Sequence, residues 1–125
     1  MSHPGLLRRA VARLAASAQV HEAQELQQGC VSLGAVPVVE LPDRERVRVA
    51  GVLRSVTLRP RSGVPALVAE LYDGSGSVDL IWLGRRRIPG IEPGRSLVAV
   101  GRVTQDHKRP VIFNPRYELR PVGGE

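Results

Sequence analysis

This chain of 125 residues has one cysteine, four aromatic residues and a single lysine among its 18 basic residues. The lone cysteine, Cys30, excludes an intrachain disulfide, and no Cys/His cluster has the spacing of a zinc site. No run approaches the ~18 apolar residues that a membrane span requires, and the N-terminus lacks the apolar segment of a secretory signal. We therefore expect a cytoplasmic protein that needs no metal, other cofactor or membrane.

Catalytic motifs are also missing from the sequence. It contains no P-loop and no dinucleotide-binding glycine fingerprint. Ser75 lies within Asp73–Gly76, which lacks the G-x-S-x-G pattern of a nucleophile elbow. The three histidines, His3, His21 and His107, are far apart in the chain. The sequence therefore predicts a protein that is not an enzyme.

Positive charge is concentrated in one part of the chain. Residues 1–45 carry four arginines against five acidic residues, a net charge of −1. Residues 46–125 carry 13 arginines and one lysine against seven acidic residues, a net charge of +7. A general preference for arginine over lysine is one explanation. An excess confined to one segment favours the other, a surface that binds a polyanion such as nucleic acid.

The residue pattern of positions 1–30 predicts a helical extension at the N-terminus. Apolar residues recur there at helical spacing, at Leu7, Val11, Leu14 and Ala18. We expect helix over residues 6–28, with Gly29 as the residue that ends it. One bent helix and two short helices, the second capped by Ser17, are both compatible with the pattern. Residues 31–45 read as a connector, because Pro37 and Pro42 interrupt any regular helix.

From residue 46 the apolar pattern changes to the period of two that is typical of strands. Five runs are predicted, at residues 46–59, 66–72, 77–83, 97–103 and 110–120. Gly51 allows the long first run to bend, and Asp73–Gly76 is a hairpin signal. Pro115 within the last run indicates an edge position or a bend. Short strands with glycines at the corners predict a small closed barrel at residues 46–120, followed by a tail at 121–125.

Three stretches carry a family resemblance. They are Val-Arg-Val-Ala-Gly-Val-Leu at 47–53, Leu-Tyr-Asp-Gly-Ser-Gly-Ser-Val-Asp-Leu-Ile-Trp at 71–82, and Glu-Pro-Gly-Arg-Ser-Leu-Val-Ala-Val-Gly-Arg-Val at 92–103. Their order resembles the OB-fold of the tRNA-anticodon and helicase type, which includes the wedge domain of RecG helicases and the N-terminal domains of class II aminoacyl-tRNA synthetases. Residues 58–67 and 82–94 also resemble small stand-alone actinobacterial OB-fold proteins. The resemblance implies a mainly β fold, a five-stranded Greek-key OB-fold barrel with an N-terminal α-helical extension, and nucleic-acid binding.

An OB-fold binds its ligand across strands two and three, between the loop joining strands one and two and the loop joining strands four and five. On this basis the predicted nucleic-acid-binding residues are Arg54, Arg59, Arg61, Tyr72, His107, Lys108 and Arg109. The cluster Arg85, Arg86 and Arg87 is either a second phosphate contact or a solvated turn. Strand alternation places Trp82 in the core, and Glu70 and Asp79 on the binding face, where their charge would repel phosphate.

Few aromatic residues remain for stacking on bases, so we expect weak, largely sequence-independent binding of single-stranded DNA or RNA through loop arginines. The alternative is a protein-interaction adaptor. In that case the N-terminal helix would bind a protein partner or a second copy of the chain, and the barrel would serve as a rigid support.

Overall fold

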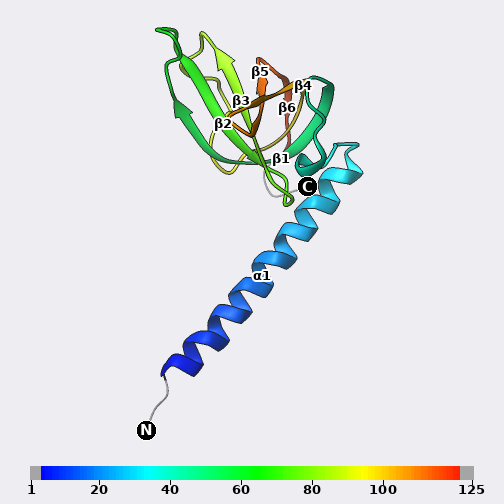
Figure 1. Cartoon of the computed structure of the whole chain (residues 1–125), viewed down its shortest axis with the longest axis vertical. Coiled ribbons are helices and arrows are strands. Elements are labelled where there is room, and N and C mark those ends of the chain that lie inside the picture. The colour runs from blue at the N-terminus through cyan, green and yellow to red at the C-terminus, as the bar shows by residue number, and fades with distance from the viewer. Residues whose placement is uncertain (1–3, 122–125) are drawn as a thin grey trace.

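The protein is mainly β with one long helix, as the sequence predicts (Figure 1). The computed structural model describes residues 4–121. The elements in chain order are α1 (Pro4–Ser32), a short 3-10 turn (Val38–Glu40), β1 (Arg46–Leu58), β2 (Ala66–Tyr72), β3 (Ser77–Leu83), β4 (Ser96–Asp106), β5 (Arg109–Phe113) and β6 (Arg116–Leu119). The second and third strands have the predicted bounds. β4 is longer than predicted, because it pairs with three other strands.

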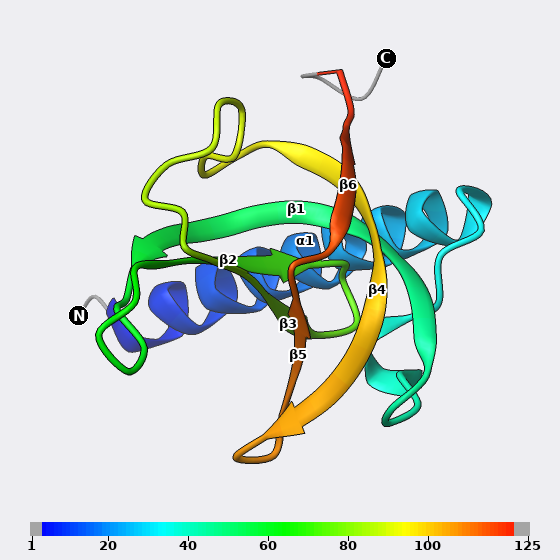
Figure 2. The same ribbon diagram turned by 90° about the horizontal axis from the view of Figure 1, so that it is seen from above.

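The strands close into a ring in the order β1–β2–β3–β5–β4, and β4 pairs back onto β1. The pairing of β3 with β5 is parallel and the other ladders are antiparallel. This arrangement of five strands is consistent with the predicted Greek-key OB-fold. In Figure 2 the strands surround a closed interior, and α1 lies beneath them. The predicted fold class is therefore confirmed.

β1 is long enough to serve two sides of the ring. Residues 46–52 pair with β4, and residues 52–58 pair with β2. The register shifts between Leu53 and Ser55, so the bulge falls at Arg54 rather than at Gly51. Gly51 has a different role, because a Cβ there would overlap the carbonyl oxygen of Tyr72. It lets two backbones approach closely at the bend.

The predicted fifth strand is divided in two. β5 and β6 follow the same edge of β4, separated by Asn114 and Pro115. Asn114 has a φ of 50°, and its side-chain oxygen accepts a hydrogen bond of 2.9 Å from the Leu83 amide. Proline cannot donate to a ladder, so the break falls at the residue that the sequence marks.

The core fills the ring with alternate residues of each strand. Trp82 is buried in it as predicted, and its indole N–H donates to the Pro115 carbonyl at 3.2 Å. The segment between β3 and β4 also contributes, through the buried side chains of Ile88 and Ile91. The burial of these two residues anchors the segment between β3 and β4 to the core.

α1 is one continuous helix, which decides between the two predicted forms. It runs past Gly29 to Ser32, so the expectation that Gly29 ends it is wrong. Gly34, with a φ of +77°, takes the left-handed conformation after the last turn instead. Cys30 packs on the ring beside Ala50 and Val98. Within residues 4–121, no helix is both long and apolar enough to span a membrane.

The rest of α1 projects away from the ring as an arm (Figure 1). The apolar residues that the sequence places on one helical face have no ring to pack against. Leu7, Val11 and Leu14 are 72%, 60% and 71% exposed. Residues 1–3 and 122–125 lie outside the described part of the chain.

The turn between β2 and β3 anchors the helix to the ring. Asp73 is 2% exposed, and its carboxylate accepts hydrogen bonds from the backbone amides of Val38, Ser75 and Gly76 at 2.8, 2.8 and 3.0 Å. Gly74 has a φ of +93° and lies directly against the Ala23 carbonyl of α1. The predicted hairpin turn is confirmed, and it also joins the ring to both the helix and the connector.

Candidate functional site

The outer face of β2 and β3 has an apolar floor. Val68 and Ile81 alternate with the core residues of β2 and β3 and so point outward with Glu70 and Asp79, yet they are only 7% and 2% exposed. They form a small cluster with Ala66, Val111 and the half-buried Phe113. Side chains from the adjoining loops and strands cover this cluster, so the ring has a second apolar patch outside its core.

A hollow of about 260 Å³ lies over this floor. It is lined by residues of the β1–β2 loop, of β2 and β3, and of the β4–β5 turn: Arg59, Arg61, Val68, Asp79, Ile81, Asp106, His107, Arg109 and Val111. The structure thus brings together four of the predicted site residues, Arg59, Arg61, His107 and Arg109. A second hollow of about 280 Å³ adjoins it and adds Ser55, Thr57 and Glu70.

Arg109 forms ion pairs with both acidic residues of this face, Asp79 and Glu70. Its guanidinium donates two hydrogen bonds to Asp79, at 2.9 and 3.0 Å, and lies 3.5 Å from Glu70. The hydrogen bond to Asp79 is the main cause that raises the pKa of Arg109 above its ordinary value. The expected repulsion of phosphate by Glu70 and Asp79 is therefore reduced. Arg109, however, is a bridge between carboxylates rather than a free cation.

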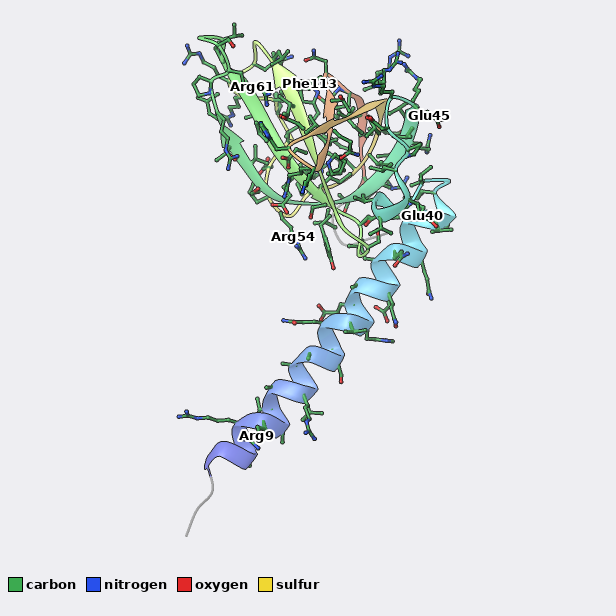
Figure 3. All side chains as sticks on the ribbon, in the orientation of Figure 1. Arg9, Glu40, Glu45, Arg54, Arg61 and Phe113 are labelled. Atoms are coloured by element: carbon green, nitrogen blue, oxygen red, sulfur yellow. The ribbon has the colours of Figure 1, made fainter. Side chains whose placement is uncertain are left out.

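Arg61 is also partly engaged. Its guanidinium lies 3.3 Å from Asp106, and its central carbon lies 5.2 Å from the centre of the Phe113 ring. Figure 3 labels Arg61 and Phe113 together at the end of the ring farther from α1. Arg59 forms no ion pair with a carboxylate of residues 4–121. Arg59 is therefore the cation of the hollow that is available to a ligand.

The β4–β5 connection is a two-residue turn rather than a loop. His107 and Lys108 have φ values of 51° and 67°, as in the primed turns that join antiparallel strands. His107 lies 3.5 Å from Asp106, its side chain is almost fully exposed, and it reaches the rim of the hollow. Lys108 is exposed and does not line the hollow.

Arg54 and Tyr72 occupy a different place from the other predicted site residues. The Arg54 guanidinium lies flat over the Tyr72 ring, 3.4 Å from its centre. Figure 3 shows Arg54 at the end of the ring nearer α1. Both side chains line a cleft of about 580 Å³ that α1 closes on one side. The predicted set is thus split in two, because Arg54 lies at the bulge of β1 and Tyr72 at the end of β2, where α1 docks.

The Arg85–Arg87 cluster lies in the open segment after β3, with all three side chains exposed. The Gly84 amide donates to the Pro65 carbonyl at 2.7 Å, so the cluster begins beside the β1–β2 loop. This contact puts it near the end of the ring that carries Arg61. Both interpretations of the cluster, phosphate contact and solvated turn, stay open.

Sequence reasoning missed some residues of these hollows. Ser55 and Thr57 could have been found from strand alternation, because they face outward beside Glu70 and Val68. Gln19, Glu22 and Ala23 of α1 line the cleft next to Tyr72, and no sequence signal points to them. Their position depends on where the helix docks. Among residues 4–121, no group of three or more His, Cys, Asp or Glu side chains could hold a metal ion.

Comparison with solved structures gives a likeness of fold. No protein-family model matches the chain. No curated protein matches it either. Among solved structures, the chain is similar to RecG in a structure of RecG bound to a three-way DNA junction, with a TM-score of 0.54 and 24% sequence identity. The match covers 68% of this chain and 12% of the RecG chain. The chain therefore shares its fold with a small part of a DNA-bound protein.

Proposed function

We propose that this protein binds nucleic acid without catalysing a reaction, and that its ligand is single-stranded DNA or RNA held weakly and with little sequence preference. One observation carries the proposal. The β1–β2 loop and the β4–β5 turn converge on a hollow across β2 and β3, where an apolar floor lies beside Arg59, which forms no ion pair within residues 4–121. This is the position at which OB-folds bind oligonucleotides. The likeness of fold to RecG in a DNA complex supports a nucleic-acid ligand.

The charges of the two hollows explain why binding should be weak. Their lining residues include three arginines, Arg59, Arg61 and Arg109, and three carboxylates, Glu70, Asp79 and Asp106. Arg59 would contact a phosphate, and Arg61 would stack on a base with Phe113 behind it. Few phosphates are neutralised in this arrangement, so the electrostatic part of the affinity is small, and added salt weakens binding in proportion to these few contacts. The sequence features that predict a cytoplasmic protein are compatible with this role.

The test is fluorescence anisotropy of labelled 12-nucleotide DNA and RNA strands at low and moderate salt. We expect binding at low salt that weakens at moderate salt, and its loss in the double variant Arg59→Glu, Arg61→Glu. The control is Arg46→Glu, Arg102→Glu, which changes the charge equally at paired positions of β1 and β4 outside the hollow. No binding at low salt would rule the proposal out. Equal losses in both double variants would mean that only net charge attracts the strand.

A protein-interaction adaptor is the second candidate, favoured by the exposed apolar residues Leu7, Val11 and Leu14 of the arm. It predicts that Leu7→Gln with Leu14→Gln abolishes self-association or partner binding and leaves strand binding intact. Analytical ultracentrifugation over a range of concentrations measures the self-association. Substitution is preferable to deletion of residues 1–30, because Leu26 and Cys30 pack on the ring. A mass that stays monomeric at every concentration would eliminate a second copy as the partner.

A further inference from the structure

The cleft between α1 and the ring has one wall from the helix and one from the sheet. Gln19, Glu22 and Ala23 line it on the helix side, and Arg54 and Tyr72 on the sheet side. Its volume of about 580 Å³ is within the range of small-molecule sites. The two walls are held together where the Gly74 turn packs against the Ala23 carbonyl. The cleft therefore exists only because the helix is docked on the ring, and both elements form its walls.

This cleft continues the hollows of the binding face. Thr57 pairs with Val68, Ser55 with Glu70, and Val52 with Tyr72, so the outward side chains of β2 form one row. The row begins at the apolar floor, passes the Arg109 bridge at Glu70, and ends at Tyr72 in the cleft. Four residues of strand span about 13 Å. A nucleic-acid strand bound along this row would extend two or three nucleotides beyond the apolar floor and reach the cleft.

The chemistry of the cleft suits a base better than a phosphate. Arg54 lies flat on Tyr72 at 3.4 Å, and a guanidinium in this position offers its plane to a stacking base. Glu22, on the opposite wall, repels phosphate but accepts hydrogen bonds from exocyclic amino groups. The Gln19 amide can both donate and accept at the edge of a base.

We propose that the cleft is a base-binding subsite that takes an unpaired base with an exocyclic amino group, and that α1 supplies the wall that reads its edge. The inference rests on the proposed function, because the base must belong to a strand held on the ring face. It assigns α1 a binding role that is separate from the exposed apolar residues farther along the arm. The competing explanation is that Arg54 and Tyr72 only cover each other and the surface beneath them.

The experiment compares labelled dC4, dC8 and dT8 strands by fluorescence anisotropy at low salt, with the full chain. We expect dC8 to bind more tightly than dT8, and dC4 to occupy only the ring face. In the variant Gln19→Ala, Glu22→Ala, the affinity for dC8 should fall about tenfold, as for the loss of one base contact. Its affinity for dC4 should not change. Both substitutions favour helix, so the fold is retained.

The control variant is Gln24→Ala, Glu25→Ala, which removes the same two types of side chain from the same helix outside the cleft, together with the exposed contact between Glu25 and His21. It should bind dC8 like the parent protein or slightly more tightly. Tyr72→Ala should lower the affinity for dC8 and leave the affinity for dC4 unchanged. Equal affinities for dC8 and dT8, or equal behaviour of the cleft and control variants, would overturn the subsite. If the subsite is overturned in this way but Arg59→Glu still weakens the binding of every DNA strand, the proposed function survives. If none of the strands binds, both the subsite and the proposed function are rejected.

Discussion

At the scale of single residues, Asp73 does the most to join the parts of the protein. Its buried carboxylate accepts hydrogen bonds from three backbone amides and from the Ser75 hydroxyl, the last at 2.7 Å. One of these amides belongs to Val38 of the connector, 35 residues away in sequence. A buried carboxylate is tolerated only when hydrogen bonds replace its hydration. Asp73 therefore both shapes the hairpin turn and fixes the connector to it.

We predict that Asp73→Ala lowers the free energy of unfolding by about 3 kcal/mol, because buried amides lose their acceptor. Urea denaturation followed by circular dichroism measures the change. Ser75→Ala is the matched comparison. It removes the hydroxyl's hydrogen bond to Asp73 and the longer one, of 3.3 Å, that the hydroxyl accepts from the Val39 amide, and it should cost about 1 kcal/mol. Equal effects of the two substitutions would contradict the special role of the carboxylate.

Cys30 makes stability depend on pH in the alkaline range. Burial of the thiol, and secondly the charge of Asp73, raise its pKa from 9.0 to about 11. The folded protein thus keeps the proton more tightly than the unfolded chain does. We predict that the contribution of the Cys30 thiol to the free energy of unfolding is fully present below pH 9 and is lost as the pH rises from 9 to about 11. Urea midpoints across this range measure the decline, which should be absent in Cys30→Ala.

At the scale of elements, the contact between α1 and the β2–β3 turn positions the helix. Gly74 has a φ of +93°, and a Cβ there would overlap the Ala23 carbonyl. Both the backbone conformation and the close approach exclude larger residues. The direction of the helix relative to the ring depends on this turn and on the packing of Cys30.

We predict that Gly74→Ala costs more than 2 kcal/mol of stability and loosens the end of α1 that docks on the ring. The control is Gly63→Ala, at a φ of +78° with nothing within 4 Å of its Cβ, which should cost only about 1 kcal/mol of backbone strain. Hydrogen exchange of the amides at 23–30 would report the loosening. Unchanged exchange in Gly74→Ala would argue against this turn as the anchor.

At the scale of the whole molecule, the positive charge is spread more widely than the binding face. The two hollows carry equal numbers of arginines and carboxylates. Much of the net charge of +7 in residues 46–125 must therefore lie elsewhere. The exposed cluster Arg85–Arg87, which begins next to the β1–β2 loop, is the densest part of it. A strand that leaves the hollow at this end would meet these side chains.

We predict that replacing Arg85, Arg86 and Arg87 by glutamine reduces the salt dependence of strand binding. For single strands the slope of log K against log salt is about −0.7 per phosphate contacted, so three lost contacts change it by about 2. Anisotropy titrations at several salt concentrations measure the slope. Replacing Arg46, Arg102 and Arg116, exposed residues of β1, β4 and β6 outside the hollows, by glutamine is the control of equal charge. An unchanged slope in the cluster variant would identify the cluster as a solvated turn.

The sequence alone determined the elements whose signals are local. The bounds of β2 and β3 follow from alternation on either side of Asp73–Gly76, and Pro115 marks the break between β5 and β6. The outward direction of Val68 and Ile81 and the burial of Trp82 follow from the same alternation. These features depend on backbone geometry within a few residues, which side-chain periodicity reports directly.

Only the tertiary structure decided which side chains meet. Arg109 reaches Asp79 because β3 and β5 pair in parallel, and this brings together residues 30 apart in the chain. Arg54 at the bulge of β1 and Tyr72 at the end of β2 lie apart from the other predicted site residues, and the docking of α1 makes their surroundings a cleft. Long-range contacts of this kind depend on how strands and helices pack, and residue spacing in the sequence does not encode that packing.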